Sequence, residues 1–208
     1  MLRASVFDFA AEVDRQIAQL TREEIHRRRG RAKRLIEEHY PLSRFAPHCK
    51  YPETELEVEA FEDDGPLDGV IRFSGNRQSE FHVEVTYVHS YEEALRRELL
   101  WTTGSTPAVG RIFRDKVTRK IVASQGLETA EQEANRLATA IIELFNKKRV
   151  KKYKRGTMLL IAIDDPTFFS HRCWNPLIAA LKKHGGLSGT FGEVHLFNCA
   201  TNELQIDI

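Results

Sequence analysis

Hydrophobic residues near the start of the chain recur at the spacing of an amphipathic helix. They are Val6, Phe9, Ala10, Val13, Ile17 and Leu20. Thr21 and Glu24 then form a capping-box pattern that predicts a second helix, which we expect to end before Pro41. The pattern therefore predicts an N-terminal helical segment over residues 1–40 that packs on a core formed by residues 41–208.

The hydrophobic period changes from helical to alternating at Glu55, which indicates strands with one buried face. Strands are predicted over 55–60, 67–73 and 81–88. Short turn sequences separate them, so we expect an antiparallel meander of three strands.

The second half of the chain alternates between helical and strand patterns. We expect a capped helix over 90–101, a small hairpin from 111–113 and 120–123, and a long helix from about Thr129. The run 157–163 is apolar at nearly every position, which is typical of a central strand covered on both faces.

Asn175-Pro176 predicts the start of a short helix that Gly185-Gly186 closes. Final strands are predicted at 194–197 and 203–208. The order of elements favours an α/β fold: a mixed central sheet, made of the antiparallel meander plus the buried strand, flanked by helices.

The composition is that of a globular protein, with a formal net charge of +1 and hydrophobic residues at 41% of the positions. No apolar run approaches the ~20 residues needed to cross a bilayer, and the first residues lack a secretory pattern, so we expect no membrane contact. The three cysteines form no CxxC pair. This usage favours a reducing compartment, and we expect the protein to be cytoplasmic.

Basic and acidic residues are separated along the chain. Two basic tracts cover 27–34 and 147–155, and acids gather at 53–64. Such separation is typical of a protein that binds a polyanion and holds cations near it, although two solvated helix faces would give the same pattern. The predicted phosphate contacts are Arg28, Arg31, Arg34, Lys148, Lys151, Lys152 and Lys154.

Two acids of the predicted meander could share a site. Asp68 starts the second strand, and Glu84 lies in the third strand on the side opposite its main apolar stripe. If the turn at 74–77 joins the strands directly, the two carboxylates converge at one end of the hairpin. Paired carboxylates on a sheet suit Mg²⁺ or Mn²⁺, which activate water in phosphodiester hydrolysis.

The run Leu67-Asp68-Gly69, a hairpin, Glu84-Val85-Thr86 and a capped helix resemble the PD-(D/E)XK nuclease superfamily. The resemblance implies a restriction-endonuclease-like fold and a Mg²⁺- or Mn²⁺-dependent nuclease. It also implies that Asp68 and Glu84 are the two acids of the motif. An acid from the first core helix often joins such sites, and Glu37 or Glu38 is the candidate here, with Glu59 as a further ligand.

The sequence departs from that family pattern at two positions. Leu67 stands where the motif has proline, and Thr86 stands where it has a lysine that stabilises charge on the phosphate in the transition state. The resemblance thus places Thr86 at a catalytic position without the catalytic group. A lysine from elsewhere would have to replace it, and Lys116, Lys120, Lys152 and Lys154 are the candidates.

The sequence therefore predicts a nuclease that acts on nucleic acid, DNA more than RNA, with specificity that is either low or supplied by a protein partner. The main alternative is a non-catalytic binding or assembly protein that keeps the nuclease fold, with Thr86 as the mark of lost activity. A plain nucleic-acid-binding module with incidental acids is a third interpretation.

Overall fold

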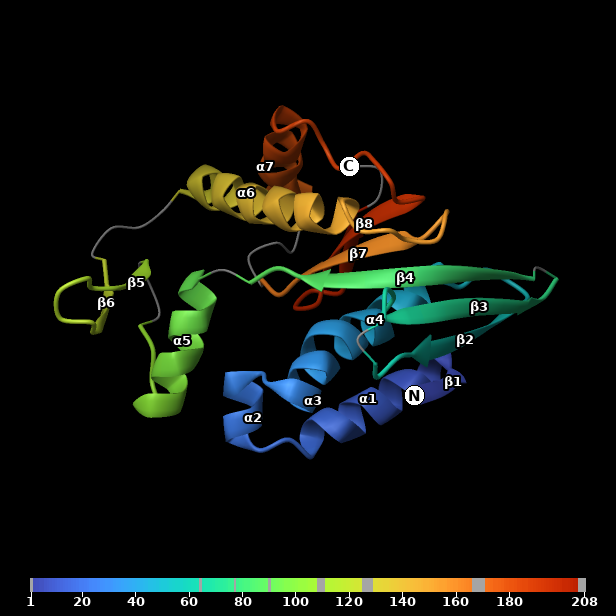
Figure 1. The fold of residues 1–208 in the computed structure, drawn as a ribbon, viewed down its shortest axis with the longest axis horizontal. Coiled ribbons are helices and arrows are strands. Elements are labelled where there is room, and N and C mark those ends of the chain that lie inside the picture. Colours follow the sequence, from blue (N-terminus) through green and yellow to red (C-terminus); the bar gives the residue numbers. More distant parts are fainter. Residues whose placement is uncertain are drawn as a thin grey trace.

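The computed structural model describes residues 2–63, 65–76, 78–89, 91–107, 111–124, 129–165 and 171–205, with the side chains of 171–173 left out. Within these residues the chain forms an α/β fold whose sheet lies between two layers of helices (Figure 1). No helix in these ranges is both long enough and apolar enough to cross a membrane.

The central sheet has seven strands in the described part of the chain and is mixed. Strands β1 to β4 are antiparallel neighbours, as the predicted meander requires, and the sheet continues with β7 and β8 parallel to β4. The order across the sheet is β1 (Leu2–Ser5), β2 (Thr54–Ala60), β3 (Gly69–Gly75), β4 (Ser79–Tyr87), β7 (Met158–Ile163), β8 (Glu193–Asn198) and β9 (Glu203–Gln205).

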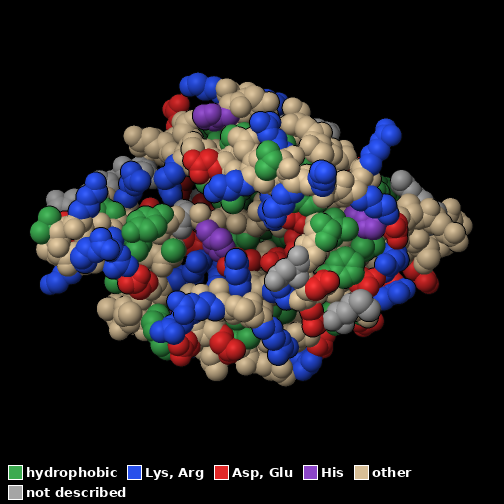
Figure 2. Space-filling model, viewed as in Figure 1, with side chains coloured by type: hydrophobic (Ala, Val, Ile, Leu, Met, Phe, Trp, Pro, Cys, Tyr) green, Lys and Arg blue, Asp and Glu red, His purple; other side chains and the backbone are tan. Residues whose placement is uncertain are grey.

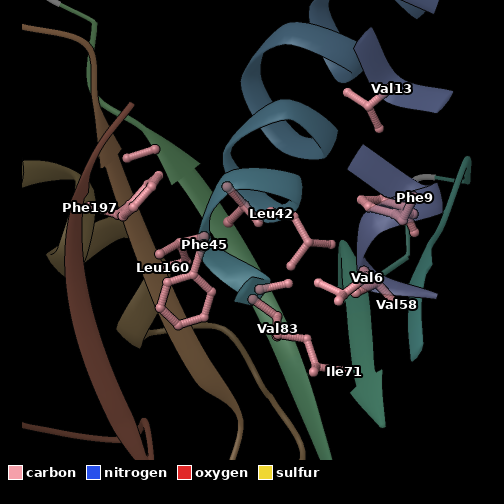
Figure 3. Packing of buried hydrophobic residues seen from close by; sticks show 14 of the residues in the cluster. Val6, Phe9, Val13, Leu42, Phe45, Val58, Ile71, Val83, Leu160 and Phe197 are labelled. Carbon is pink, nitrogen blue, oxygen red and sulfur yellow. The ribbon is translucent and has the colours of Figure 1, made fainter. Parts of the chain in front are cut away.

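N-terminal helices cover one face of the sheet. Helix α1 (Val6–Ala18) and helix α4 (Tyr40–Phe45) bury apolar side chains against alternate residues of the strands, because successive strand residues point to opposite faces. Figure 3 shows this packing, in which Phe9 and Leu42 meet Val58, Ile71 and Val83. Strand β1, which the helical spacing did not predict, pairs with β2, so the N-terminal segment is part of the sheet itself.

Two later helices cover the other face over β7 and β8 (Figure 1). The first is α6 (Ala130–Arg149), which begins at the capping box of Thr129 and Gln132, and the second is α7 (His171–Lys183). The predicted helix start at Pro176 is wrong, because Pro176 lies inside α7. Strand β7 is buried at every position between the two layers, as its continuous apolar sequence predicted.

The predicted second helix is broken into several pieces. Helix α2 (Arg22–Arg27) carries the expected Thr21 capping box, but it ends where Arg28 takes a left-handed conformation, with φ 44°. The chain becomes helical again in α3 (Gly30–Arg34). It then continues through the π-helical turn η1 (Leu35–His39), α4 and the 3-10 turn η2 (Ala46–Cys49).

Pro41 does not end the helix, contrary to the prediction. It lies in the first turn of α4, where its missing N–H costs little, and the preceding turn adopts the wider π form, in which Tyr40 N–H donates to Leu35 O. The helical stretch therefore runs past residue 40 without a break, and the predicted domain boundary falls inside it.

Between β4 and α6 the chain forms helix α5 (Tyr91–Thr102) and a two-stranded sheet of β5 (Ile112–Arg114) and β6 (Ile121–Ala123). These elements stand at one end of the molecule, outside the central sheet (Figure 1). The structure confirms the predicted hairpin. The Ser90 residue of the predicted helix cap lies outside the described residues.

Gly69 permits close packing where β3 begins. A Cβ atom at this position would lie 2.6 Å from Leu42 Cδ2 and 2.7 Å from Glu59 O, so one of these groups would have to move. We therefore expect Gly69→Ala to lower the free energy of unfolding by about 1–3 kcal/mol in urea denaturation. Gly65→Ala is the control, because its Cβ would meet nothing closer than 3.7 Å. Equal urea midpoints for the two variants would contradict this packing.

Candidate functional site

Asp68 and Glu84 lie side by side on adjacent strands. Gly69 pairs with Val83 in the antiparallel register, and Asp68 N–H donates to Val83 O at 3.0 Å, so the next pair along the ladder is Asp68 with Glu84. Val83 and Val85 point into the core beneath α1 and α4. Glu84 therefore points to the other face of the sheet, towards α6.

Asp68 is held in place by the backbone of the neighbouring strand. Its Oδ2 accepts a hydrogen bond of 2.7 Å from Val85 N–H. Burial, together with the negative charges of Glu84 and Glu38, raises the pKa of Asp68 to about 7, although the Val85 hydrogen bond and Lys148 act in the opposite direction. Three acids therefore share this end of the hairpin, and we call Asp68, Glu84 and Glu38 the carboxyl cluster.

Glu84 is almost fully buried and has two partners from outside the meander. Lys148 Nζ, at the C-terminal end of α6, donates to Glu84 Oε1 and lies 3.4 Å from Val85 O. Tyr153 Oη donates to the same carboxylate oxygen at 3.1 Å. Burial and the charge of Glu84 raise the pKa of Tyr153, so its hydroxyl stays protonated and remains a donor. The cation next to Glu84 therefore comes from a helix 64 residues later in the chain.

The π turn η1 contributes an acid to each of two sites. Glu38 lies near Asp68 and Lys148, where burial raises its pKa against the opposing charges of Arg34 and Lys148. The Oε2 atom of Glu37 instead lies 2.9 Å from His89 Nε2. Of the two candidate glutamates, the structure thus brings Glu38 to the carboxyl cluster.

Glu37 belongs to a second charged network next to the cluster. Its members are Arg28, Glu37, Tyr87, His89, Glu93 and Asp164. Burial opposes protonation of His89, but the carboxylates of Glu37 and Glu93 outweigh it and raise its pKa. The Tyr87 hydroxyl donates to Asp164 at 2.9 Å, just beyond the end of β7. This network fixes the end of β4 against α2 and α5.

Two other predicted site residues have different surroundings. Thr86 is buried on the same face of β4 and carries no charge, so it cannot replace the missing lysine. Glu59 is buried as well, but its carboxylate is bound by Arg72 Nη1, which separates it from the carboxyl cluster. Its role as a further metal ligand therefore stays a prediction.

The candidate lysines for the missing motif position lie elsewhere. Lys154 Nζ is 2.6 Å from His82 Nε2 and 3.5 Å from Glu80, while Lys152 is exposed. Lys116 and Lys120 lie in the β5–β6 hairpin. Lys148, which the sequence predicted only as a phosphate contact, is the lysine that touches Glu84, and the sequence offered no signal to select it among its basic neighbours.

The predicted phosphate contacts divide into inward and outward side chains. Arg28 is 12% exposed in its side chain and stacks 5.2 Å over the Tyr87 ring, and Arg34 Nη1 donates to Glu62 O. These two arginines and Lys148 therefore have structural contacts in place of an open surface. Arg31 is exposed but its Nη2 donates to Gln16 Oε1 at 3.0 Å, and Lys151, Lys152 and Lys154 are exposed.

Figure 2 shows the surface around this region. Lys and Arg side chains gather around a hollow between the α3, α5 and α6 parts of the molecule, and acidic side chains and a histidine are visible within it. A polyanion approaching this face would meet cations first and acids at the centre.

The donor atoms of the cluster suit a hard divalent cation. Glu84 Oε1, Val85 O and the nearby Asp68 carboxyl are oxygens, the ligand type that Mg²⁺ and Mn²⁺ prefer. Within the described residues, however, no three Asp, Glu, His or Cys side chains stand close enough to hold a metal ion as they are. Burial is the first cause of the raised pKa of Asp68, ahead of the charges of Glu84 and Glu38. The Lys148 ammonium occupies Glu84 Oε1, so a cation would fit these oxygens only by taking its place.

Comparisons with known proteins add no relative: no family model matches the sequence, and neither curated proteins nor solved structures gave a match.

Asp68 makes stability depend on pH in a defined direction. The folded protein keeps the Asp68 proton up to about pH 7, whereas the unfolded chain releases it near 3.8, so the ionised group weakens the fold as pH rises between these values. The gain in melting temperature from Asp68→Asn should be at least ~2–4 °C larger at pH 8 than at pH 5 in EDTA, because only part of the ionisation penalty is present at pH 5. Asp63→Asn, in an exposed turn, is the control. A gain at pH 5 equal to that at pH 8 would refute the buried, raised-pKa state.

The Glu84–Lys148 pair should be strongly coupled in a double-mutant cycle. Lys148→Met leaves the Glu84 carboxylate buried without its cation and should cost ~3–5 kcal/mol of unfolding free energy, while Glu84→Gln/Lys148→Met should cost less than the two single changes together. Arg15→Met breaks an ion pair with Glu12 on the surface of α1, so its cost should be far smaller than that of Lys148→Met. Additive costs for Glu84 and Lys148 would show that the pair does not form.

Proposed function

We propose that this protein is a metal-dependent nuclease that hydrolyses phosphodiester bonds in DNA. The observation that carries the proposal is the meeting of Asp68, Glu84 and Glu38 with Lys148, brought together by the start of β3, the middle of β4, η1 and α6. Asp68 and Glu38 have raised pKa values, and Glu84 is buried beside a lysine; acids in such surroundings are costly to a fold and typical of catalytic sites.

The order and pairing of the elements support a restriction-endonuclease-like fold. A helical segment with Glu38, the β2–β3–β4 meander, intervening helices and the parallel strand β7 follow one another as in the PD-(D/E)XK superfamily that the motif resembles. The proposal on fold rests on this order and on the placement of Asp68 and Glu84 at one end of the hairpin.

Asp68, Glu84 and Val85 O would hold a Mg²⁺ or Mn²⁺ ion, with Glu38 next to them. When bound, such an ion lowers the pKa of a water molecule and neutralises charge on the phosphate. Val85 N–H orients the Asp68 carboxylate, and Tyr153 Oη orients that of Glu84. These donors keep the acids in place, which metal ligation requires.

Lys148 would supply the positive charge that Thr86 cannot. Its Nζ lies beside Glu84 and Val85 O, and its side chain is 21% exposed. Once an ion displaces it from Glu84 Oε1, the ammonium would be free to donate to a phosphate oxygen next to the ion and stabilise the negative charge that develops during hydrolysis.

Binding to DNA would rest on the exposed cations near the site. Lys151, Lys152 and Lys154 follow α6 directly, and Arg31 lies on α3. Side chains of this type contact phosphates and do not read bases, so a protein partner would supply further specificity at this part of the surface.

One observation favours the alternative of a non-catalytic protein with the same fold. The Lys148 ammonium already lies on Glu84 Oε1 and beside Val85 O, where a metal ion would bind. If this pair never opens, the cluster is a structural ion pair and the protein binds nucleic acid or a partner without cutting.

Cleavage of supercoiled plasmid in Mn²⁺ or Mg²⁺ separates the two possibilities. We expect the wild type to cut the plasmid. The cleavage rate should fall about 10²-fold or more in each of the variants Asp68→Asn, Glu84→Gln and Lys148→Met, which is the usual effect of removing one electrostatic group from an active site. Binding to the same DNA in EDTA should change less than threefold in Asp68→Asn.

Glu55→Gln is the matched control for this assay, because Glu55 is an exposed acid on β2 outside the cluster. It should cut at the wild-type rate. No metal-dependent cleavage by the folded wild type, or full activity in Glu84→Gln, would refute the nuclease proposal.

A further inference from the structure

The β5–β6 hairpin forms an arm together with α5, and the hairpin itself contributes no residue to the site described above. Helix α5 is attached to α2, since Arg22 Nη2 donates to Leu100 O at 3.0 Å and the Arg27 guanidinium lies 5.8 Å over the Trp101 ring. The hairpin stands beyond α5 at the end of the molecule (Figure 1). It is therefore held in a defined position away from the central sheet.

The two faces of the hairpin differ in their contacts. On the inner face Ile112 is buried, and Arg114 Nη2 donates to Glu98 on α5. On the outer face the cross-strand pair Phe113 and Val122 is 46% and 37% exposed. Val117, in the connecting turn, is 89% exposed. The outer face thus offers apolar side chains to an external surface.

Cations dominate the charge of the hairpin. Residues 111–124 carry five basic side chains and one acid, which are Arg111, Arg114, Lys116, Arg119, Lys120 and Asp115. The acid is engaged within the turn, where Asp115 Oδ1 accepts from Val117 N–H at 3.1 Å and from Thr118 Oγ1 at 2.8 Å. Lys116 and Lys120 are exposed. Blue side chains accordingly cover much of this end in Figure 2.

We propose that the β5–β6 hairpin inserts into the major groove of duplex DNA. That groove is about 12 Å wide and admits a two-stranded ribbon. Lys116 and Lys120 would contact phosphates, and the outer pair of Phe113 and Val122 would face the base edges, where thymine methyl groups offer apolar contacts. Because the major groove of duplex RNA is deep and narrow, the hairpin favours DNA over RNA.

Duplex DNA would be the substrate of the proposed nuclease. Binding of DNA by the hairpin does not require nuclease activity, but its role in substrate recognition rests on the proposed function. A membrane surface would also attract cations beside apolar residues, but membrane-surface segments are typically helices with a broad apolar face. The hairpin has a narrow apolar pair with cations in the adjoining turn, which matches a groove lined by phosphates better than a bilayer.

Binding to a 30-base-pair A·T-rich DNA duplex in EDTA, followed by fluorescence anisotropy from 50 to 200 mM KCl, tests the proposal without any cleavage. Lys116→Ser/Lys120→Ser should lower the slope of log Kd against log salt by about two and weaken binding about ten- to thirtyfold near 0.15 M salt. Lys182→Ser/Lys183→Ser removes two exposed lysines at the end of α7 and should change affinity less than twofold. Unchanged melting temperatures ensure that both variants are folded.

The groove and the type of nucleic acid are tested in the same assay. Replacing thymine by uracil in the duplex should weaken wild-type binding severalfold but leave the affinity of Phe113→Ser unchanged. The major-groove ligand methyl green should compete with the protein for DNA, and the minor-groove ligand netropsin should not. Wild-type affinity in Lys116→Ser/Lys120→Ser would overturn the proposal. So would an equal loss with duplex RNA, or with vesicles of anionic phosphatidylserine, since either would indicate general attraction to polyanions or membranes.

Failure of this inference and failure of the nuclease proposal are distinguishable. A wild type that shows no metal-dependent cleavage but binds DNA through Lys116 and Lys120 refutes the nuclease alone. A wild type whose cleavage depends on Glu84, but whose DNA affinity is independent of the hairpin, refutes the role of the arm alone.

Discussion

The buried charge of Glu84 is the constraint on which the candidate site depends. A carboxylate in the middle of a covered strand loses most of its hydration, and it is tolerated only with a cation and further donors at hand. Lys148 and Tyr153 meet this need from the end of α6 and the segment that follows it. Their contacts tie the antiparallel meander to the parallel half of the sheet, because the same chain segment leads directly into β7.

Much of the architecture could be predicted from local signals. The alternation in β2 to β4, the apolar run of β7, the capping box at Thr21 and the start of the long helix at Thr129 each reflect the chemistry of neighbouring residues, and the structure agrees with them. The prediction failed where contacts between residues far apart in the sequence determine the structure. Pro41 and Pro176 both indicate a helix boundary locally, yet Pro41 follows a π turn at the start of α4 and Pro176 lies inside α7.

The candidate site shows the same division. The periodicity of the strands placed Glu84 on the face away from the main apolar stripe, but its closeness to Asp68 also depended on a direct turn between the strands and on the family resemblance. It could not choose between Glu37 and Glu38, because a π turn shifts the direction of both side chains, nor select Lys148 from a tract of similar residues. Arg28 is the opposite case: a left-handed backbone turns it inward onto Tyr87, so a residue that reads as surface charge is part of the interior.

The π turn before Pro41 connects the carboxyl cluster with the charged network that contains His89. One extra residue in the turn rotates the helix after it by about 100° relative to the helix before it. Glu37 and Glu38 are consecutive residues in that widened turn, and they serve different neighbours, His89 on one side and the carboxyl cluster on the other. A movement of this single turn would displace both acids at once. It would therefore change the surroundings of His89, after β4, and of Asp68, before β3, together.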